Sequence, residues 1–210
     1  MQGTILHLSM WANMDEPPRR PGYVHRQVYD LHTINLDEYL AIVISMGCDQ
    51  RFLERHSDKL NQWVKAGGKI LVNGQPVRPF LEGMPQWRKL HFHGVDDIWL
   101  TAMDEHPIWE GVERKNLLLR TGVPGKHTFE ELLEIGVGGF YARAYMVGLP
   151  DNASVITGIG IGKLPVDVSY RLGEGEVIMH SGNDLDGFDT SCGEHIDMGE
   201  RVATYLGGAQ

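Results

Sequence analysis

One stretch of the sequence decides the fold: residues 39–74, which read YLAIVISMGCDQRFLERHSDKLNQWVKAGGKILVNG. Its first nine residues form an almost continuous apolar run rich in β-branched side chains, typical of a strand that is buried on both faces. Apolar residues such as Leu53 and Leu60 then recur at helical spacing, until Gly67 and Gly68 supply a stop. The run KILVNG predicts the next buried strand. A strand, a helix and a strand in this order predict a βαβ unit and therefore parallel pairing.

Apolar runs elsewhere predict that further strands join this unit. Residues 4–11, TILHLSMW, have the composition of a first, central strand, and residues 166–182 predict a hairpin across the turn GEG. Shorter strands are predicted in residues 28–36, 87–94, 96–103, 116–122, 140–148 and 153–162, and a closing amphipathic helix in 194–206. Together these elements predict one α/β domain over residues 1–210. Its central sheet is mostly parallel, contains TILHLS, LAIVIS, KILVNG and EVIMHS, is flanked by helices and is extended by antiparallel strands.

The composition excludes two classes of partner. The chain carries 28 acidic and 19 basic residues, a formal charge of −9, whereas a nucleic-acid-binding protein needs a basic surface. No apolar run approaches the ~20 residues of a membrane span, and the N-terminus lacks the basic leader of a signal peptide. Two cysteines are too few for a disulfide framework. We therefore expect a cytoplasmic protein with reduced thiols and no nucleic-acid or membrane partner.

Four pieces of the chain, in order, resemble one family: LAIVISMG…LNQWVKAGGKILVNG, HPIWEGV, VDVSYRLGEGEVIMHSG and the final helix. The chain resembles the class I glutamine amidotransferase-like superfamily, within it the branch that includes the ThuA-like proteins and the trimerisation-type domains of some β-galactosidases. The resemblance implies a flavodoxin-like sheet. These motifs are structural, since their glycines mark tight turns or close backbone approach.

The chain departs from this family at the residues that hydrolyse glutamine in active members. Active members carry a nucleophilic cysteine in a G-x-C-x-G turn after the strand that follows the double glycine, and a His-x-Glu pair after the last core strand. Here the turn reads Asn73-Gly74-Gln75, and the last strand ends in His180 without that His-x-Glu order. An amide cannot supply the nucleophile for acyl transfer. The resemblance therefore implies a member that has lost glutamine hydrolysis.

Candidate site residues follow the predicted strands, because ligands of open α/β sheets bind beyond the carboxyl ends of the strands. His180 is the candidate general base and Asp184 the carboxylate expected to orient it. Cys48 is a candidate catalytic thiol, although a small buried residue at a strand end is the favoured interpretation. Polar and aromatic side chains at the same edge are expected to contact a polyhydroxylated or amide-bearing ligand: Ser9, Trp11, Asn73, Gln75 and Asn183.

No metal or cofactor is expected. His91 and His93 lie two apart on a predicted strand, but structural zinc needs four ligands and catalytic zinc three. The acidic run NDLDGFD fails the calcium-loop pattern, which would place Gly182 at its first position. The run GIGIGK ends a predicted strand instead of opening a helix, so it does not predict a dinucleotide loop.

The sequence is compatible with three functions. The first is a non-amidotransferase domain that binds a small polar metabolite, sugar-like or nucleotide-like, or serves as an accessory subunit with a homo-oligomeric or other protein partner. The second is a ThuA-like enzyme, a hydrolase or sugar-modifying activity on a carbohydrate-derived substrate with His180 as general base. The third is a structural oligomerisation domain, which rests on fold analogy alone.

Overall fold

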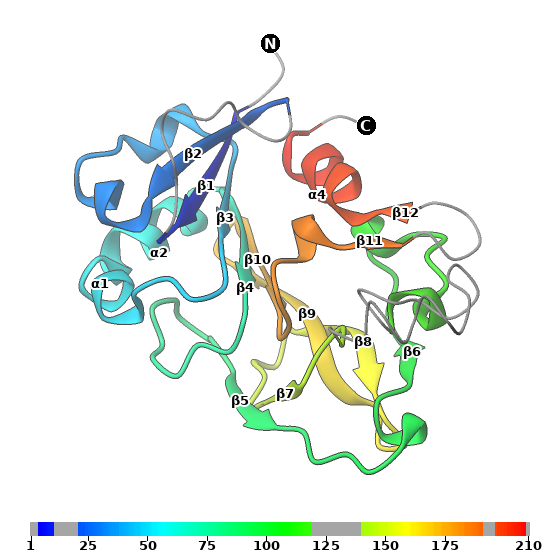
Figure 1. Ribbon diagram of the computed structural model, residues 1–210. Coiled ribbons are helices and arrows are strands. Elements are labelled where there is room, and N and C mark those ends of the chain that lie inside the picture. Colours follow the sequence, from blue (N-terminus) through cyan, green and yellow to red (C-terminus); the bar gives the residue numbers. More distant parts are fainter. Residues whose placement is uncertain (1–3, 11–20, 119–139, 191–195, 209–210) are drawn as a thin grey trace.

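A central sheet of eight strands organises the chain, in the order β2-β1-β3-β4-β10-β9-β8-β6 (Figure 1). The structure is a computed structural model and describes residues 4–10, 21–118, 140–190 and 196–208. Five strands form the parallel part of the sheet: β2 (Tyr23–Gln27), β1 (Ile5–Ser9), β3 (Ala41–Ile44), β4 (Lys69–Asn73) and β10 (Gly175–His180). Three antiparallel strands extend the sheet: β9 (Leu164–Leu172), β8 (Ser154–Ile159) and β6 (Leu100–Ala102).

Two small antiparallel pairs lie outside this sheet. They are β5 (Gln86–Lys89) with β7 (Ala144–Val147), and β11 (Asp189–Thr190) with β12 (Ile196–Asp197). The α-helices are α1 (Gln50–Arg55), α2 (Ser57–Lys65) and α4 (Met198–Leu206). Short 3₁₀ helices are η1 (Val28–His32), η2 (Leu36–Glu38), η3 (Val95–Asp97), η4 (Pro107–Trp109), η5 (Arg114–Leu117) and η6 (Leu185–Gly187).

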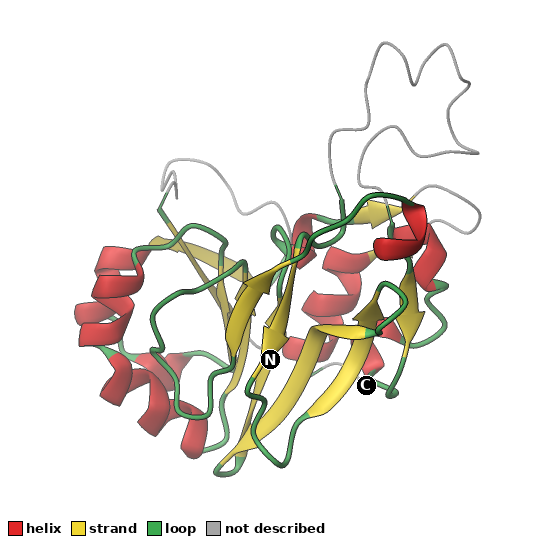
Figure 2. Ribbon diagram, turned by 90° about the horizontal axis from the view of Figure 1, so that it is seen from below, coloured by secondary structure: helices red, strands yellow, loops and turns green. Residues whose placement is uncertain are grey.

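Helices cover both faces of the sheet and create two cores (Figure 2). One core joins α1, α2 and η1 to the face that carries Leu6, Ile42 and Val72. The other joins α4, η4 and η6 to the face that carries Val43 and Leu71. Every residue of β3 and β10 is buried, which explains why these strands read as continuous apolar runs instead of alternating ones. No helix in the described part of the chain is long and apolar enough to cross a membrane.

The predicted βαβ unit is confirmed, and its packing depends on glycine. Gly67 adopts φ +117, a left-handed conformation that ends α2 without steric cost. Gly175 opens β10 against the end of the same helix, where a Cβ would lie 1.9 Å from the carbonyl oxygen of Val64. The helix can therefore approach the sheet only because this strand begins with a glycine. The four strands predicted for the central sheet are all in it, with Ile44 and Leu71 buried.

Three predicted elements were wrong. The single helix after Cys48 is two helices, α1 and α2, which meet at His56. Residues 28–36, predicted as a strand, form η1 and the start of η2 instead. Val28 and Leu31 are both buried, at the spacing of three residues that suits a 3₁₀ helix. Asn35 caps η2, because its side chain accepts a hydrogen bond from the backbone N–H of Asp37. The described part of the predicted strand 116–122 is likewise 3₁₀ helix and a bend.

Candidate functional site

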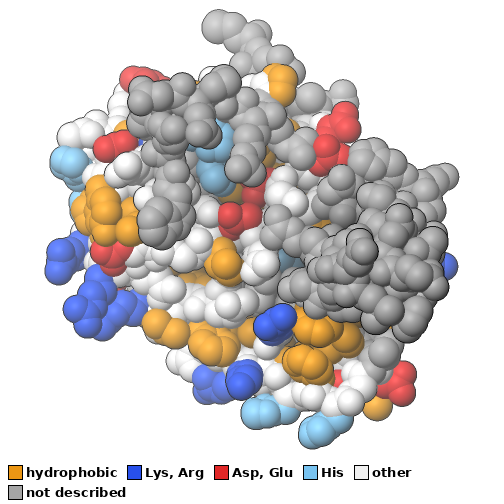
Figure 3. Space-filling view, viewed as in Figure 1, with side chains coloured by type: hydrophobic (Ala, Val, Ile, Leu, Met, Phe, Trp, Pro, Cys, Tyr) orange, Lys and Arg blue, Asp and Glu red, His pale blue; other side chains and the backbone are white. Residues whose placement is uncertain are grey.

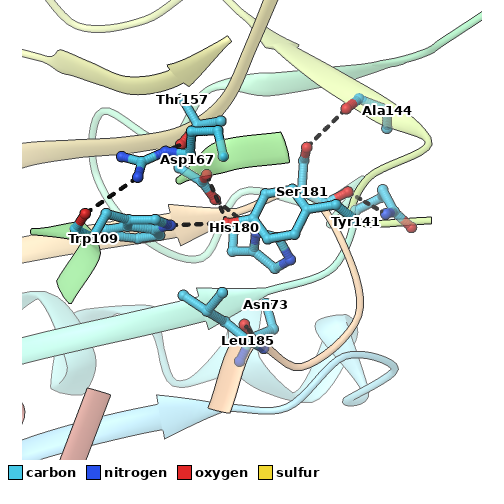
Figure 4. Close-up of polar contacts among 11 residues, drawn as sticks. Asn73, Trp109, Tyr141, Ala144, Thr157, Asp167, His180, Ser181 and Leu185 are labelled. Atoms are coloured by element: carbon cyan, nitrogen blue, oxygen red, sulfur yellow. Dashed lines mark hydrogen bonds and ion pairs between the residues drawn. The ribbon is translucent and has the colours of Figure 1, made fainter. Parts of the chain in front are cut away.

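Polar side chains gather where the central parallel strands end. The parallel register places His180, the last residue of β10, beside Asn73, the last residue of β4. Ser45 follows β3 directly, and its backbone N–H donates to Leu8 of β1. Figure 4 shows the contacts on the β4 and β10 side of this edge. The predicted convergence of residues at the carboxyl edge therefore agrees with the strand order.

Asn73 connects two neighbouring loops. It ends β4 as predicted, and Gly74 makes the tight turn at φ +91, donating its N–H to the carbonyl of His180 at 3.0 Å. The Asn73 amide donates to the Ile44 carbonyl at 3.3 Å and accepts from the Leu185 N–H at 3.0 Å. Its side chain is buried, with 4% of the residue exposed, and a space of about 20 Å³ beside it holds no more than about one water. The expectation that Asn73 faces an open pocket is corrected: its amide is engaged by the protein backbone.

Gln75 plays a similar structural part. Its side-chain amide donates to the Ser181 carbonyl at 2.6 Å, and the Ser181 hydroxyl donates to the Ala144 carbonyl at 2.8 Å. These bonds tie the turn after β4 to the segment after β10 and to β7. The Gln75 Nε2 donor is thus already used.

Asp184 does not orient His180, so that prediction was wrong. Its carboxylate accepts hydrogen bonds from the Ser45 hydroxyl and from the backbone N–H of Met46. Both donors lie just past the end of β3. The hydrogen-bond donors at the end of β3 are therefore already bonded to a carboxylate of the protein itself.

Asp167 is the carboxylate that holds His180. The two residues are cross-strand partners in the β9–β10 hairpin, and Nδ1 of His180 donates to Oδ1 of Asp167 at 2.6 Å, with both side chains fully buried. The second oxygen of Asp167 accepts from the Tyr141 hydroxyl at 2.8 Å, which in turn accepts from the indole N–H of Trp109 at 2.9 Å. The result is a buried chain of four side chains (Figure 4).

Electrostatics in this buried chain follow from desolvation. Burial, and then the charge of Asp167, raise the pKa of Tyr141 well above its ordinary value. Burial lowers the pKa of Arg114, whose guanidinium donates to the Thr157 hydroxyl at 2.9 Å and to the Val112 carbonyl at 2.8 Å. The positive charge of Arg114 interacts favourably with the buried carboxylate of Asp167.

The other ring nitrogen of His180, Nε2, is buried and has no hydrogen-bond partner among the described residues. Because the carboxylate accepts from Nδ1, a neutral ring carries its lone pair on Nε2, the arrangement of a general base. Gly182 packs against this nitrogen: a Cβ there would lie 2.3 Å from Nε2 and 2.1 Å from the Tyr141 carbonyl oxygen. The unpartnered Nε2 therefore faces the backbone of Gly182, where a larger residue would not fit.

Cys48 is a packing residue. It is 6% exposed, and its thiol donates to the Leu8 carbonyl at 3.4 Å. Burial, followed by the charge of Asp184, raises the pKa of the Cys48 thiol to about 12. At neutral pH it is a thiol and not the thiolate that a nucleophile requires.

The remaining predicted ligand contacts are spread along the edge. Ser9 ends β1 and is buried, whereas Asn183 is half-buried in the loop after β10. Trp11 lies outside the described residues. Sequence reasoning missed His7 and His25, cross-strand partners in β1 and β2 whose Nδ1 atoms are 3.0 Å apart. An Asp186 oxygen lies 3.8 Å from Nε2 of His7.

His91 and His93 do not share a strand face, because β5 ends at Lys89 and both side chains are exposed. Within the described ranges, no three His, Cys, Asp or Glu side chains are grouped to hold a metal ion.

Comparisons with known proteins show the fold alone. No family model and no curated protein matches the chain. It is similar in structure to cytoplasmic protein STM3548 of Salmonella typhimurium, with a TM-score of 0.54 and 14% identity over 96% of this chain and 98% of that one. It is also similar to cytoplasmic protein STM1381 of Salmonella typhimurium LT2, with a TM-score of 0.52 and 13% identity over 86% and 88%. A β-galactosidase from Rahnella sp. R3 matches at a TM-score of 0.48 and 11% identity, over 99% of this chain and 31% of the enzyme.

Proposed function

We propose that this chain is a class I glutamine amidotransferase-like domain of the ThuA-like branch that binds a small, neutral, polyhydroxylated molecule and does not hydrolyse glutamine. The order of its parallel strands, β2-β1-β3-β4-β10, supports a flavodoxin-like sheet. In such sheets the ligand binds where the strand order reverses, beyond the carboxyl ends of β1 and β3. A cytoplasmic location is part of the proposal and rests on the composition.

The observation that carries the choice of ligand is the contact of Asp184 with Ser45 and Met46. A phosphate or carboxylate ligand needs backbone N–H groups and hydroxyls at this position. Here an internal carboxylate already holds them, and it would repel a second anion. A neutral sugar, by contrast, offers hydroxyls that can donate to a carboxylate.

The loss of glutamine hydrolysis is supported separately. The turn after β4 offers Asn73, Gly74 and Gln75, with both side-chain amides held by backbone atoms. The nearby thiol, Cys48, is buried and protonated at neutral pH. Neither supplies a nucleophile for an acyl-enzyme.

Thermal unfolding in the presence of defined compounds tests this proposal. A panel of neutral monosaccharides and sugar alcohols should include members that raise the Tm by about 3–6 °C at tenfold excess over Kd, whereas AMP, ATP and inorganic phosphate should not. Stabilisation by the nucleotides and by none of the neutral compounds would contradict the proposal. Release of ammonia from glutamine by the purified protein would contradict its second half.

A second candidate function is supported by the unpartnered Nε2 of His180. The dyad with Asp167 would make this residue the general base of a sugar-modifying or hydrolytic enzyme. The test is turnover of the sugars that bind, compared between the wild type and His180→Gln, together with the NMR titration of the His180 ring. Turnover that is lost in the variant, while the sugar still raises its Tm, would favour the enzyme over the binding domain.

A further inference from the structure

A groove of about 520 Å³ lies between the loop that follows β4 and strand β5, and its lining begins at Pro76, next to Gln75 in the sequence. Its apolar lining includes Val77, which is 70% exposed, together with Met84 and Trp87. Three prolines, at positions 76, 79 and 85, add apolar rings that offer no N–H donor. Figure 3 shows hydrophobic side chains gathered with Lys and Arg over this region. A groove of this size and composition is large enough to take several side chains of a partner.

The groove is preformed, because its loop is fastened to the body of the protein. The Gln50 side chain of α1 accepts from the backbone N–H groups of Val77 and Arg78, at 2.8 and 3.2 Å. Further along, Glu82 donates its N–H to the Asn61 side chain at 2.8 Å and accepts on its carbonyl from the Tyr170 hydroxyl at 3.0 Å. Binding to such a loop loses little conformational entropy.

One wall of the groove is a strand with an unoccupied side. Strand β5 pairs with β7 alone among the described strands, and its residues are exposed apart from a half-buried Trp87. Extended peptides add to such edges through main-chain hydrogen bonds and place alternate side chains in the neighbouring pockets. Tryptophan beside an edge of this kind is a frequent anchor of binding energy.

The charge at this wall selects the partner. Arg88 and Lys89 line the groove, and no ion pair to either is found in the described part of the chain, although the protein as a whole carries −9. The other charged residues nearby are matched, Arg78 by Glu54 at 2.8 Å and Glu82 by Lys65 at 2.6 Å. Arg88 now donates to the Trp87 carbonyl at 3.2 Å, and an acidic guest would give its guanidinium a charged acceptor instead.

The same charges oppose pairing of β5 with a second copy of itself, because basic residues on an edge strand repel an identical edge. We propose that the groove and β5 bind an extended segment of another protein in which acidic and apolar residues alternate.

An array of ten-residue peptides, varied independently in charge and in apolar positions, tests this proposal on the full-length protein. Peptides with alternating Glu or Asp and Val or Leu should bind most tightly by fluorescence anisotropy, and replacing their acidic residues with Lys should weaken binding about tenfold or more. Trp87→Ala and Lys89→Glu should each cause a comparable loss. The control Lys115→Glu makes the same charge change at an exposed position of η5 and should leave binding unchanged.

Several outcomes would overturn the proposal. They are an array without any bound peptide, bound peptides with no preference for acidic residues, and groove variants that bind like the wild type. Sedimentation that shows a dimer dissociated by Lys89→Glu would also overturn it, since the occupant would then be a second copy of the chain.

Discussion

At the scale of single residues, Asp184 matters most for the choice of ligand. Replacing it with alanine frees the Met46 N–H and the Ser45 hydroxyl beyond β3 and removes a repelling charge. Inorganic phosphate should then bind about tenfold more tightly or better, while the free energy of unfolding falls by about 1–3 kcal/mol. Calorimetric titration with phosphate measures the first effect and urea denaturation the second.

Asp151→Ala is the matched control, since that aspartate is exposed in the turn before β8 and its loss changes the net charge equally. Equal phosphate affinity in the two variants would mean that Asp184 does not block an anion site.

A second prediction at this scale concerns the buried carboxylate of Asp167. Asp167→Ala removes the acceptor of both the His180 ring and the Tyr141 hydroxyl in a fully buried setting. The free energy of unfolding should fall by about 3–5 kcal/mol, because donors are left unsatisfied and the Arg114 charge is left without a counterpart. Ser169→Ala, on the same strand but only half-buried, should cost less than about 1 kcal/mol. Similar losses in both variants by urea denaturation would contradict this assignment.

How far the sequence predicts these residues depends on the range of the contact. The hairpin register alone pairs position 167 with 180, so a carboxylate between two valines in β9 was a detectable signal for the His180 partner. The contact of Asp184 with Ser45 was not, because it joins loops 139 residues apart whose conformations no local pattern specifies. Asn73 was placed correctly at its strand end, yet its two backbone partners depend on the same loops.

At the scale of the elements, close packing of α2 on β10 is the feature most sensitive to substitution. Gly175→Ala would place a Cβ 1.9 Å from the Val64 carbonyl and 2.3 Å from that of Gly68, so helix and strand would have to separate. We expect a loss of about 3 kcal/mol or more in the free energy of unfolding. Gly94→Ala, where a Cβ meets nothing within 4 Å, should be neutral or slightly stabilising by thermal unfolding. A neutral Gly175→Ala variant would refute this packing.

The amino end of β10 predicts a pH dependence of stability. The Glu176 carboxylate accepts from the Tyr205 hydroxyl of α4 at 2.6 Å and lies 3.4 Å from Nε2 of His106, while Lys69 lies over the Tyr205 ring at 3.9 Å. Burial alone would raise the pKa of Glu176, but the contact with His106, the hydrogen bond from Tyr205 and the charge of Lys69 hold the pKa below its ordinary value. A lowered folded-state pKa contributes stability above the unfolded value of about 4.3, and that stability is lost as the pH falls through the folded value.

Glu176→Gln should therefore lower the Tm at pH 7, and the difference from the wild type should shrink as the pH falls below about 4. Glu174→Gln, exposed in the hairpin turn, is the control. Melting curves from pH 3 to pH 7 that differ by a constant amount would contradict the role of this carboxylate.

Elements whose apolar residues recur at one clear spacing were predictable, whereas elements whose apolar residues fit both a strand and a helical spacing were not. The run from residue 39 to 74 combines a buried strand, helical spacing and a glycine stop, and its βαβ unit was predicted correctly. In residues 28–36 apolar and polar residues alternate loosely, as in a strand, but Val28 and Leu31 also lie three residues apart, as in a 3₁₀ helix. Both side chains are buried in the structure, so tertiary packing favours the 3₁₀ helix over the strand. His56, where α1 and α2 meet, interrupts a helix whose sequence spacing is continuous.

At the scale of the whole molecule, two surfaces are separated by role. We propose that the neutral ligand binds at the carboxyl edge of the parallel strands and that the peptide binds in the groove beside β5. Pro76 lines both the groove and the small space beside Asn73, whereas Trp87 and Lys89 line the groove alone, so variants of these two should leave binding at the carboxyl edge unchanged. Gln75 and the prolines after it are the nearest connection between them.

The most direct test of ligand binding at the strand ends is a map of backbone amide shifts by NMR, recorded while the neutral sugar that most raises the Tm is added. The largest shifts should fall on Ser9 and on residues 45–48, at the ends of β1 and β3, with Asp184 next and β5 unchanged. Shifts confined to the groove or to the amino ends of the strands, with the amides of residues 45–48 unmoved, would contradict a binding site at the carboxyl edge.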